Sequence, residues 1–267
     1  QEAAAGAGGP GAWALSTVDQ ELAAEICDAG DLRQLARLTL ELPQELTAGP
    51  KGPKPAFLGT WMIWMVHRVF LDDPALEELD LSTYGMPAGD EEPRIAAKLW
   101  LAVAANKHLR SLCLADSNVL APCVLRPVAR DEQVVGIAAA LAANRALRVL
   151  DVACNFLDSP DLVALFGALG RGSALEEVRC SNQFCGEQAG RDVFQALDRA
   201  LKQNQTLRKL GMELTDAHWR DQITRGLIRN TEAARKRRCK KAQAGPAELA
   251  DMAAFVSRFS GADAGGA

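Results

Sequence analysis

The feature that most constrains this chain is a leucine pattern, L-x-x-L-x-L, that recurs at intervals of 33, 38, 28 and 32 residues. Its last three positions alternate between apolar, polar and apolar, which is typical of a short strand with one buried face. A regular period of this length indicates a repeat architecture. The copies are Leu76-Leu79-Leu81, Leu109-Leu112-Leu114, Leu147-Leu150-Val152, Leu175-Val178-Cys180 and Leu207-Leu210-Met212.

The segments between these strands carry apolar residues spaced three and four apart, the spacing of one helix face. One strand and one helix cannot bury their own apolar faces, so neighbouring units must stack. The sequence therefore predicts an α/β fold. It is a leucine-rich-repeat solenoid of about five strand–helix units, with parallel strands on the concave face and helical caps at both ends. The helical positions are Ile95, Leu99 and Val103; Ile137 and Leu141; Leu162, Leu165 and Leu169; Val193, Leu197 and Leu201; and Ile223, Leu227 and Ile228.

The junctions between helix and strand also repeat. Asn106, Asn144 and Asn204 each stand three residues before the first leucine of the next strand, and Gly172 occupies the matching place before Leu175. Asn and Gly tolerate a left-handed backbone conformation, which commonly ends a helix. We therefore expect a positive φ at these junctions.

An N-terminal arm precedes the repeats. Residues 1–47 combine a low-complexity start with a helical pattern that Ser16 or Thr17 would cap and that Gly30 interrupts. Residues 48–55 hold three prolines and two glycines, the composition of an extended linker. We expect this linker to separate the arm from the main body.

The solenoid is assigned to residues 56–238. Its first segment, 57–70, is apolar nearly all round, so we interpret it as a cap buried between the arm and the first repeat, with a partner-binding helix as the alternative. Residues 239–267 form a basic segment, a C-terminal helix and a loose tail. The helix is expected to follow a break at Gly245-Pro246, and to pack on the solenoid or bind a partner. Its apolar stripe is Leu249, Met252, Ala253, Val256 and Phe259.

Composition excludes several classes. The 267 residues contain 30 Lys and Arg against 34 Asp and Glu, so overall charge does not favour nucleic-acid binding. No apolar run approaches the roughly 18 residues that cross a bilayer, so no transmembrane segment is expected. The seven cysteines lack a C-x-x-C pair and are interpreted as reduced thiols.

Nothing in the sequence indicates catalysis. His67, His108 and His218 lie in separate contexts without ligand-spaced neighbours. Nucleotide-binding, serine-hydrolase and zinc-protease motifs do not occur. We expect a protein that is not an enzyme and has no cofactor or metal.

One charge cluster stands out near the C-terminus. It would steer the domain towards an acidic surface of a protein, anionic lipid or nucleic acid, or serve as a nuclear localisation signal. The alternative is a solvated helix end, where cations complement the helix dipole. RNA is disfavoured because no aromatic residues are interleaved. The cations are Arg235, Lys236, Arg237, Arg238, Lys240 and Lys241, with Arg229 shortly before them.

Five collinear segments between residues 71 and 238 carry a further signal. They are Leu71 to Leu81, Leu150 to Phe156, Asn182-Gln183, Leu207 to Gly211 and Arg229 to Arg238. Together they resemble the leucine-rich domain of the tropomodulin and leiomodin family. In order, they are similar to its first repeat, a later strand and its turn, a further turn, a further strand and the basic ending.

The resemblance implies a non-enzymatic module that binds and caps the pointed end of actin filaments, located in the cytoplasm on the cytoskeleton. The implied contact residues lie in the solenoid's last part and beyond. The short Pro- and Ala-rich arm lacks long amphipathic helices, which counts against tropomyosin as a partner. The candidate partner-binding residues are Arg229, Arg235, Lys236, Arg237, Arg238, Lys240, Lys241, Met252, Phe255 and Phe259.

A second hypothesis belongs to another class. A repeat fold does not define a function, and the alternative is that the chain is a structural scaffold subunit of a large ciliary, axonemal or organellar assembly. The second repeat interval is the longest, with its surplus at residues 119–130. Extra length in one loop often marks a contact surface.

Overall fold

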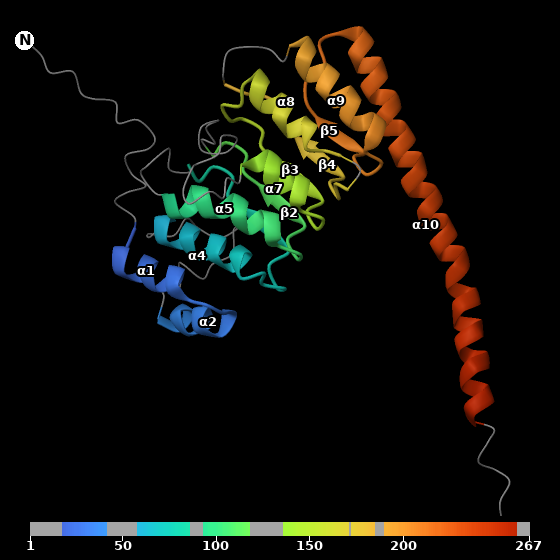
Figure 1. Ribbon diagram of the computed structural model, residues 1–267, viewed down its shortest axis with the longest axis horizontal. Helices are drawn as coiled ribbons and strands as arrows, with labels where there is room; N and C mark the ends of the chain where they lie inside the picture. Colours follow the sequence, from blue (N-terminus) through green and yellow to red (C-terminus); the bar gives the residue numbers. More distant parts are fainter. Residues whose placement is uncertain are drawn as a thin grey trace, which may run out of the picture.

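The computed structural model describes residues 18–41, 58–85, 93–117, 136–170, 172–184 and 190–260. The predicted low-complexity start, the 48–55 linker, the 119–130 loop and the tail after residue 260 lie outside these ranges. Figure 1 shows the elements stacked in sequence order. They are α1 (Gln20–Asp28), α2 (Leu32–Glu41), α4 (Leu58–Phe70), β1 (Glu78–Asp80), α5 (Pro93–Ala105), β2 (Ser111–Cys113), α7 (Ile137–Ala143), β3 (Val149–Asp151), α8 (Ser159–Gly167), β4 (Glu177–Arg179), α9 (Arg191–Gln203), β5 (Lys209–Gly211) and α10 (Ala217–Ser260).

The strands form one open parallel sheet whose order, β1-β2-β3-β4-β5, is the order of the chain. The central residues of neighbouring strands stand opposite each other, so that Leu79 pairs with Leu112 and Leu112 with Leu150. Helices α5, α7, α8 and α9 lie along one side of the sheet (Figure 1). The predicted α/β leucine-rich-repeat solenoid is confirmed.

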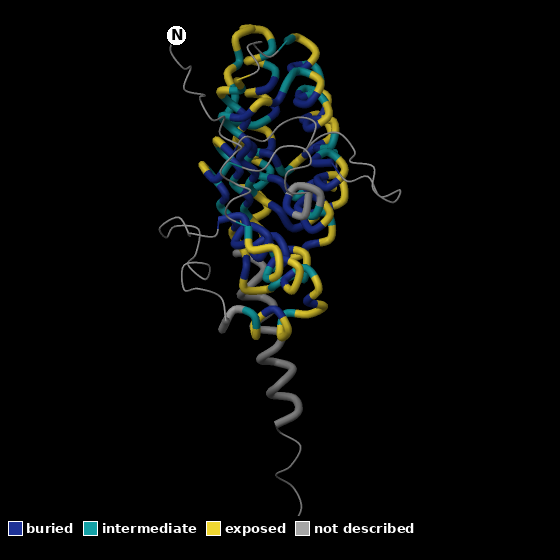
Figure 2. Tube along the Cα trace, turned by 90° about the vertical axis from the view of Figure 1, so that its left-hand side faces the viewer, coloured by how far each residue is buried: buried dark blue, intermediate teal, exposed yellow. Residues whose placement is uncertain are grey.

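The core lies between the strands and the helices, where Figure 2 shows the buried positions. The leucines of the first three repeat copies and the apolar faces of α5, α7, α8 and α9 are buried as predicted. One position was wrong: Ile228, placed on the apolar face of the last helix, is 58% exposed, whereas Ile223 is fully buried. Five residues separate them, which brings Ile228 to the opposite side of α10.

The helix–strand junctions use a different device from the one expected. Asn144 has φ −69° and Asn204 φ −79°, so both are extended and not left-handed. Each asparagine acts through its side chain instead. The Oδ1 atom of Asn144 accepts hydrogen bonds from the backbone N–H groups of Ala146 and Leu147, at 2.8 and 2.7 Å. The side chain therefore turns the chain from the helix into the next strand.

The amide of each junction asparagine also bonds back to the preceding repeat. Asn144 Nδ2 donates to the carbonyls of Val103 and Asn106, at 2.6 and 2.9 Å. Asn106 Nδ2 donates to the carbonyl of Val69 at 2.8 Å. The asparagine ladder, defined as Asn106, Asn144, Asn204 and Asn230, is buried at every position and ties consecutive units together.

Among the described residues, four of the five left-handed non-glycine residues stand at the exits of the strands, and the fifth, Asp72 (φ 55°), follows α4. Thr83, Asp116, Cys154 and Asn182 have φ between 52° and 63°. Each stands two residues after the last apolar position of its strand. The N–H of Thr83 donates to the carbonyl of Ala115 at 2.9 Å, so the turn stays bonded to the next repeat.

The N-terminal arm is part of the same core. Helix α1 begins after Asp19, whose side chain accepts from the N–H of Leu22, and the arm divides into α1 and α2 around Gly30. The proposed caps Ser16 and Thr17 lie outside the described residues. Helix α4 is buried along almost its whole length and packs between α1 and α5, which confirms its role as a cap.

His67 joins these three helices. Its Nε2 donates to the carbonyl of Ala29, after α1, at 2.7 Å. Its Nδ1 then accepts from Lys98 Nζ of α5 at 2.6 Å. Burial lowers the pKa of His67 from 6.5; the bond to Ala29 opposes this shift and the charge of Lys98 adds to it. The imidazole is therefore neutral in the folded chain at neutral pH.

This contact predicts a loss of stability in mild acid. The unfolded chain takes up a proton near pH 6.5 whereas folded His67 resists it, so its contribution is complete above pH 6.5 and is lost as the pH falls towards the folded pKa. The loss is at most about 1.4 kcal/mol per pH unit. Urea unfolding at pH 7.5 and 5.5 measures it. His67→Gln removes the titrating group, and an equal pH dependence in that variant would contradict the assignment.

Candidate protein-binding surface

Helix α10 closes the solenoid with its first turns. Ile223, Gly226 and Asn230 are buried, and the helix packs against α9. A Cβ at Gly226 would lie 3.2 Å from the side chain of Leu201, so the glycine permits the close approach. Asn230 Nδ2 donates to the carbonyls of Asn204 and Leu207, at 3.0 and 2.9 Å, and completes the asparagine ladder.

The break expected at Gly245-Pro246 is absent, because α10 is one helix from Ala217 to Ser260 (Figure 1). A proline removes one backbone hydrogen bond and tends to kink a helix without always ending it. The boundary drawn between residues 238 and 239 therefore falls inside a continuous element.

The basic segment, residues 235–240, is exposed at every position, all round α10. Arg235 pairs with Glu232 at 3.1 Å, one turn earlier. Arg237 Nη2 donates to the carbonyl of Gln205 at 3.1 Å. Among the described residues, the side chains of Lys236, Arg238 and Lys240 form no recorded hydrogen bond or ion pair. Three cations are thus available to a partner.

The structure leaves part of the predicted site undescribed. Lys241, Met252, Phe255 and Phe259 belong to α10, but their side chains lie outside the described residues. Their roles, and the choice between packing and partner binding for this half of the helix, stay predictions.

Arg229, grouped with the cluster from sequence, serves the fold. Its Nη2 donates to the carbonyl of Leu201 near the end of α9, and to Asn230 Oδ1 at 3.1 Å. A cation here complements the negative end of the α9 dipole.

We expect Arg229→Met to lower the free energy of unfolding by about 1 kcal/mol, the value of one hydrogen bond from a partly exposed charged group. Urea denaturation checks this. R238M is the matched control and should leave stability unchanged; equal losses in both variants would remove the structural role of Arg229.

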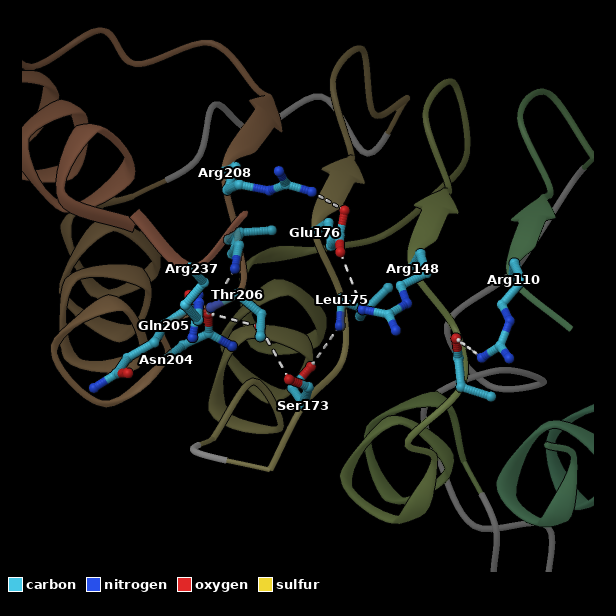
Figure 3. A network of polar contacts seen from close by, with 12 residues as sticks. Arg110, Arg148, Ser173, Leu175, Glu176, Asn204, Gln205, Thr206, Arg208 and Arg237 are labelled. Carbon is cyan, nitrogen blue, oxygen red and sulfur yellow. Dashed lines mark hydrogen bonds and ion pairs between the residues drawn. The ribbon is translucent and has the colours of Figure 1, made fainter. Parts of the chain in front are cut away.

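A row of side chains follows the edge where the strands begin (Figure 3). Arg148 Nη1 pairs with Glu176 Oε1 at 3.0 Å, and Arg208 bonds the other oxygen of the same carboxylate. The carboxylate therefore links three consecutive repeats. Arg237 of α10 lies along the same edge (Figure 3).

A second charge network lies on the strands themselves. Arg179 pairs with Glu177 at 2.6 Å and with Asp151 at 3.3 Å, and Lys209 reaches Glu177 at 3.1 Å. Partial burial would raise the pKa of Glu177, but the bonds from Lys209 and Arg179 outweigh it, so the pKa is lowered. The bond to Glu177 raises the pKa of Arg179. These charges satisfy one another on the sheet face.

An exposed aromatic pair was missed from sequence. Phe156 and Phe184 are 38% and 56% exposed, with ring centroids 5.5 Å apart. Each follows its strand by five residues, so alignment of the repeats would have predicted that they are neighbours. The N–H of Phe184 donates to the carbonyl of Asn155 at 2.7 Å and holds the two turns together.

The histidines have separate surroundings. His67 is buried, His108 pairs with Asp72 at 3.0 Å, and His218 packs edge-on against Trp219. Within the described ranges, no group of three or more His, Cys, Asp or Glu could hold a metal ion. No helix among the described residues is long and apolar enough to cross a membrane.

The chain is similar in sequence to known proteins. The model of the TMOD/LMOD leucine-rich domain matches residues 64–233. Human leiomodin-3 is 28% identical over 177 residues, 64% of this chain and 28% of that protein. Rat leiomodin-1 is 32% identical over 191 residues, 70% and 29% respectively. Human tropomodulin-4 is 25% identical over 174 residues, 65% and 46%. The chain thus spans under half the length of these relatives.

Two solved structures share the fold. One is the C-terminal domain of a Caenorhabditis elegans tropomodulin, with a TM-score of 0.57 at 22% identity over 67% of this chain and 98% of that one. The other is leiomodin-1 actin-binding site 2, with a TM-score of 0.55 at 24% identity over 67% and 94%. Each of those two chains is covered over almost its whole length, and about two thirds of this chain is covered.

Proposed function

The chain belongs to the tropomodulin/leiomodin leucine-rich domain family, and from this premise we propose that it binds actin through its solenoid and the basic segment of α10. The structure of the leiomodin-1 relative bears the name actin-binding site 2. The observation that carries the proposal is the set of exposed cations Lys236, Arg238 and Lys240, which have no recorded partner in the described part of the chain, on a helix that the last repeat holds in place.

We further propose that binding takes place at the pointed end of the filament and that its effect is steric. A rigid curved solenoid, oriented by the basic segment, would cover the face where the next actin subunit adds. Long-range attraction by the cations would speed the encounter and weaken with salt. This role places the protein on the cytoskeleton.

The test is pointed-end elongation of actin filaments with the barbed ends blocked, with and without the whole chain. Slower elongation at substoichiometric concentration supports capping. Co-sedimentation with filaments at unchanged elongation would keep actin binding and remove the capping role. Neither effect would remove both.

The exposed Phe156–Phe184 pair favours a second candidate, a scaffold subunit in a stable protein assembly. Large exposed aromatic side chains are enriched in the buried centres of protein interfaces. Purification of the native chain in a stoichiometric complex without actin would support this candidate. Recovery of the chain with actin alone would contradict it.

A further inference from the structure

A basic cavity lies where α5 and α7 end, on the edge at which strands β2 and β3 begin. Its volume is about 310 Å³. Three of its lining residues are cations and none is acidic. The others are small, apart from Asn106, whose side chain is engaged in the asparagine ladder. The lining residues are Ala104, Ala105, Asn106, Lys107, Arg110, Ala143, Arg145 and Ala146.

Each of the two guanidinium groups is held in place through its own Nη1 atom. Arg110 Nη1 donates to the carbonyl of Ala146 at 3.1 Å. Arg145 Nη1 donates to the carbonyls of Ala142 and Asn144, at 2.7 and 3.1 Å. Among the described residues, no recorded bond uses Nε or Nη2 of either arginine, so these donors remain for a ligand.

The guanidinium of Arg145 also rests against the backbone of Gly172. A Cβ built on Gly172 would lie 2.8 Å from Arg145 Cζ and Nη2, whereas a Cβ on Gly170 would meet nothing within 4 Å. A methyl group at Gly172 would therefore displace Arg145, and the same group at Gly170 would not.

The nearby carboxylates that the structure describes do not neutralise the cavity. Asp72 accepts from the amide of Lys107 and pairs with His108, and these bonds lower its pKa although partial burial opposes them. Glu77 stands at the start of β1, beyond the cavity lining. Glu176 is shared by Arg148 and Arg208. Among the described residues, positive charge thus exceeds negative charge along this edge.

The excess extends in a line. The basic edge, defined as Lys107, Arg110, Arg145, Arg148, Arg208 and Arg237, runs from the cavity towards α10 (Figure 3). From Arg110 to Arg208 it crosses three strand spacings, about 14 Å, which is the reach of roughly four extended residues. A small anion would occupy one point of this line, whereas an extended chain would follow it.

We propose that the cavity binds a carboxylate of an acidic polypeptide segment, which then runs along the basic edge. The guanidinium donors of Arg110 and Arg145 bind the carboxylate, and Lys107 adds a point charge. The cavity itself contains no residue of the basic segment of α10, although the basic edge ends at Arg237 of that segment. The proposal does not depend on the identity of that segment's partner.

The probe is a fluorescein-labelled peptide of eight glutamates, with eight glutamines as its neutral control. Fluorescence anisotropy with the whole chain at low salt measures the dissociation constant. We expect the acidic peptide to bind and the neutral one not to. Absence of binding by the acidic peptide would overturn the proposal.

The matched variants are Gly172→Ala and Gly170→Ala, which add the same methyl group and leave the charge unchanged. We expect only Gly172→Ala to weaken binding, by about three- to fivefold, the effect of losing one exposed charge pair. Equal affinities for the two variants would overturn a shaped site. Circular dichroism shows whether each variant is folded.

A second pair tests the charge. Lys107→Gln should weaken binding by a similar factor, about threefold, whereas Arg33→Gln, an exposed cation on α2, should not. Equal losses would indicate diffuse attraction and overturn the site. Inorganic phosphate and phosphatidylserine vesicles are the competitors. If phosphate or lipid displaces the peptide at a phosphate concentration below the carboxylate concentration of the peptide, the site binds phosphate or lipid instead.

Discussion

Replacing Asn144 by alanine is expected to lower the free energy of unfolding by roughly 4 kcal/mol, since each buried polar group left without a partner costs about 1–3 kcal/mol. The side chain is 4% exposed and forms four hydrogen bonds with the main chain. Its loss strands the N–H groups of Ala146 and Leu147 and the carbonyls of Val103 and Asn106. Alanine has no side-chain donor or acceptor for these four groups, and the packed repeats limit the entry of water that would replace the lost bonds.

Urea denaturation followed by circular dichroism measures this loss. Gln203→Ala, at an exposed position of α9, is the control and should change stability by less than about 0.5 kcal/mol. A loss in Asn144→Ala no greater than in the control would show that the asparagine ladder does not support the fold.

Reversing three cations of the basic segment, with K236E, R238E and K240E combined, is expected to weaken actin binding on the order of 100-fold at low salt, because each reversal replaces an attraction by a repulsion. These residues have no recorded partner among the described residues, so the fold should be unaffected. Arg235 and Arg237 are left in place because they pair within the chain. Filament co-sedimentation over a range of protein concentrations gives the affinity.

The control reverses three exposed cations elsewhere, Arg33, Arg37 and Arg199, and changes the net charge equally. We expect it to retain most of the affinity. Raised salt should weaken the wild-type chain and narrow the gap between wild type and variant. If both triple variants lose binding equally, overall charge and not the basic segment controls the interaction.

The repeat architecture was predictable because the leucine period and the helical spacing agree at every unit. The junction asparagines were also located correctly, but their conformation was not. Asn is suited both to a left-handed backbone and to side-chain bonds with the main chain. Only the structure shows that Asn144 has an extended φ and that its amide spans to the previous repeat.

The candidate site was harder to predict for a related reason. A run of cations along a sequence does not reveal which of them already have a partner in a neighbouring element. Arg229 bonds α9, whereas Lys236 has no recorded partner in the described part of the chain. The basic edge collects residues from separate repeats, and the Phe156–Phe184 contact joins two turns. Such neighbours emerge from stacking, which no single segment displays.

Asn230 has a consequence for any measured affinity. It docks α10 on the last repeat, so the helix that carries the basic segment is also the C-terminal cap of the solenoid. A partner that recognises docked α10 will bind only the fraction of molecules in which the helix is seated, so the apparent dissociation constant equals the intrinsic one divided by that fraction. By the same linkage, partner binding will increase the fraction of molecules in which α10 is docked on the last repeat. Changes at Asn204 or Leu207, which form no recorded bond with Lys236, Arg238 or Lys240 among the described residues, should therefore alter affinity by shifting this population.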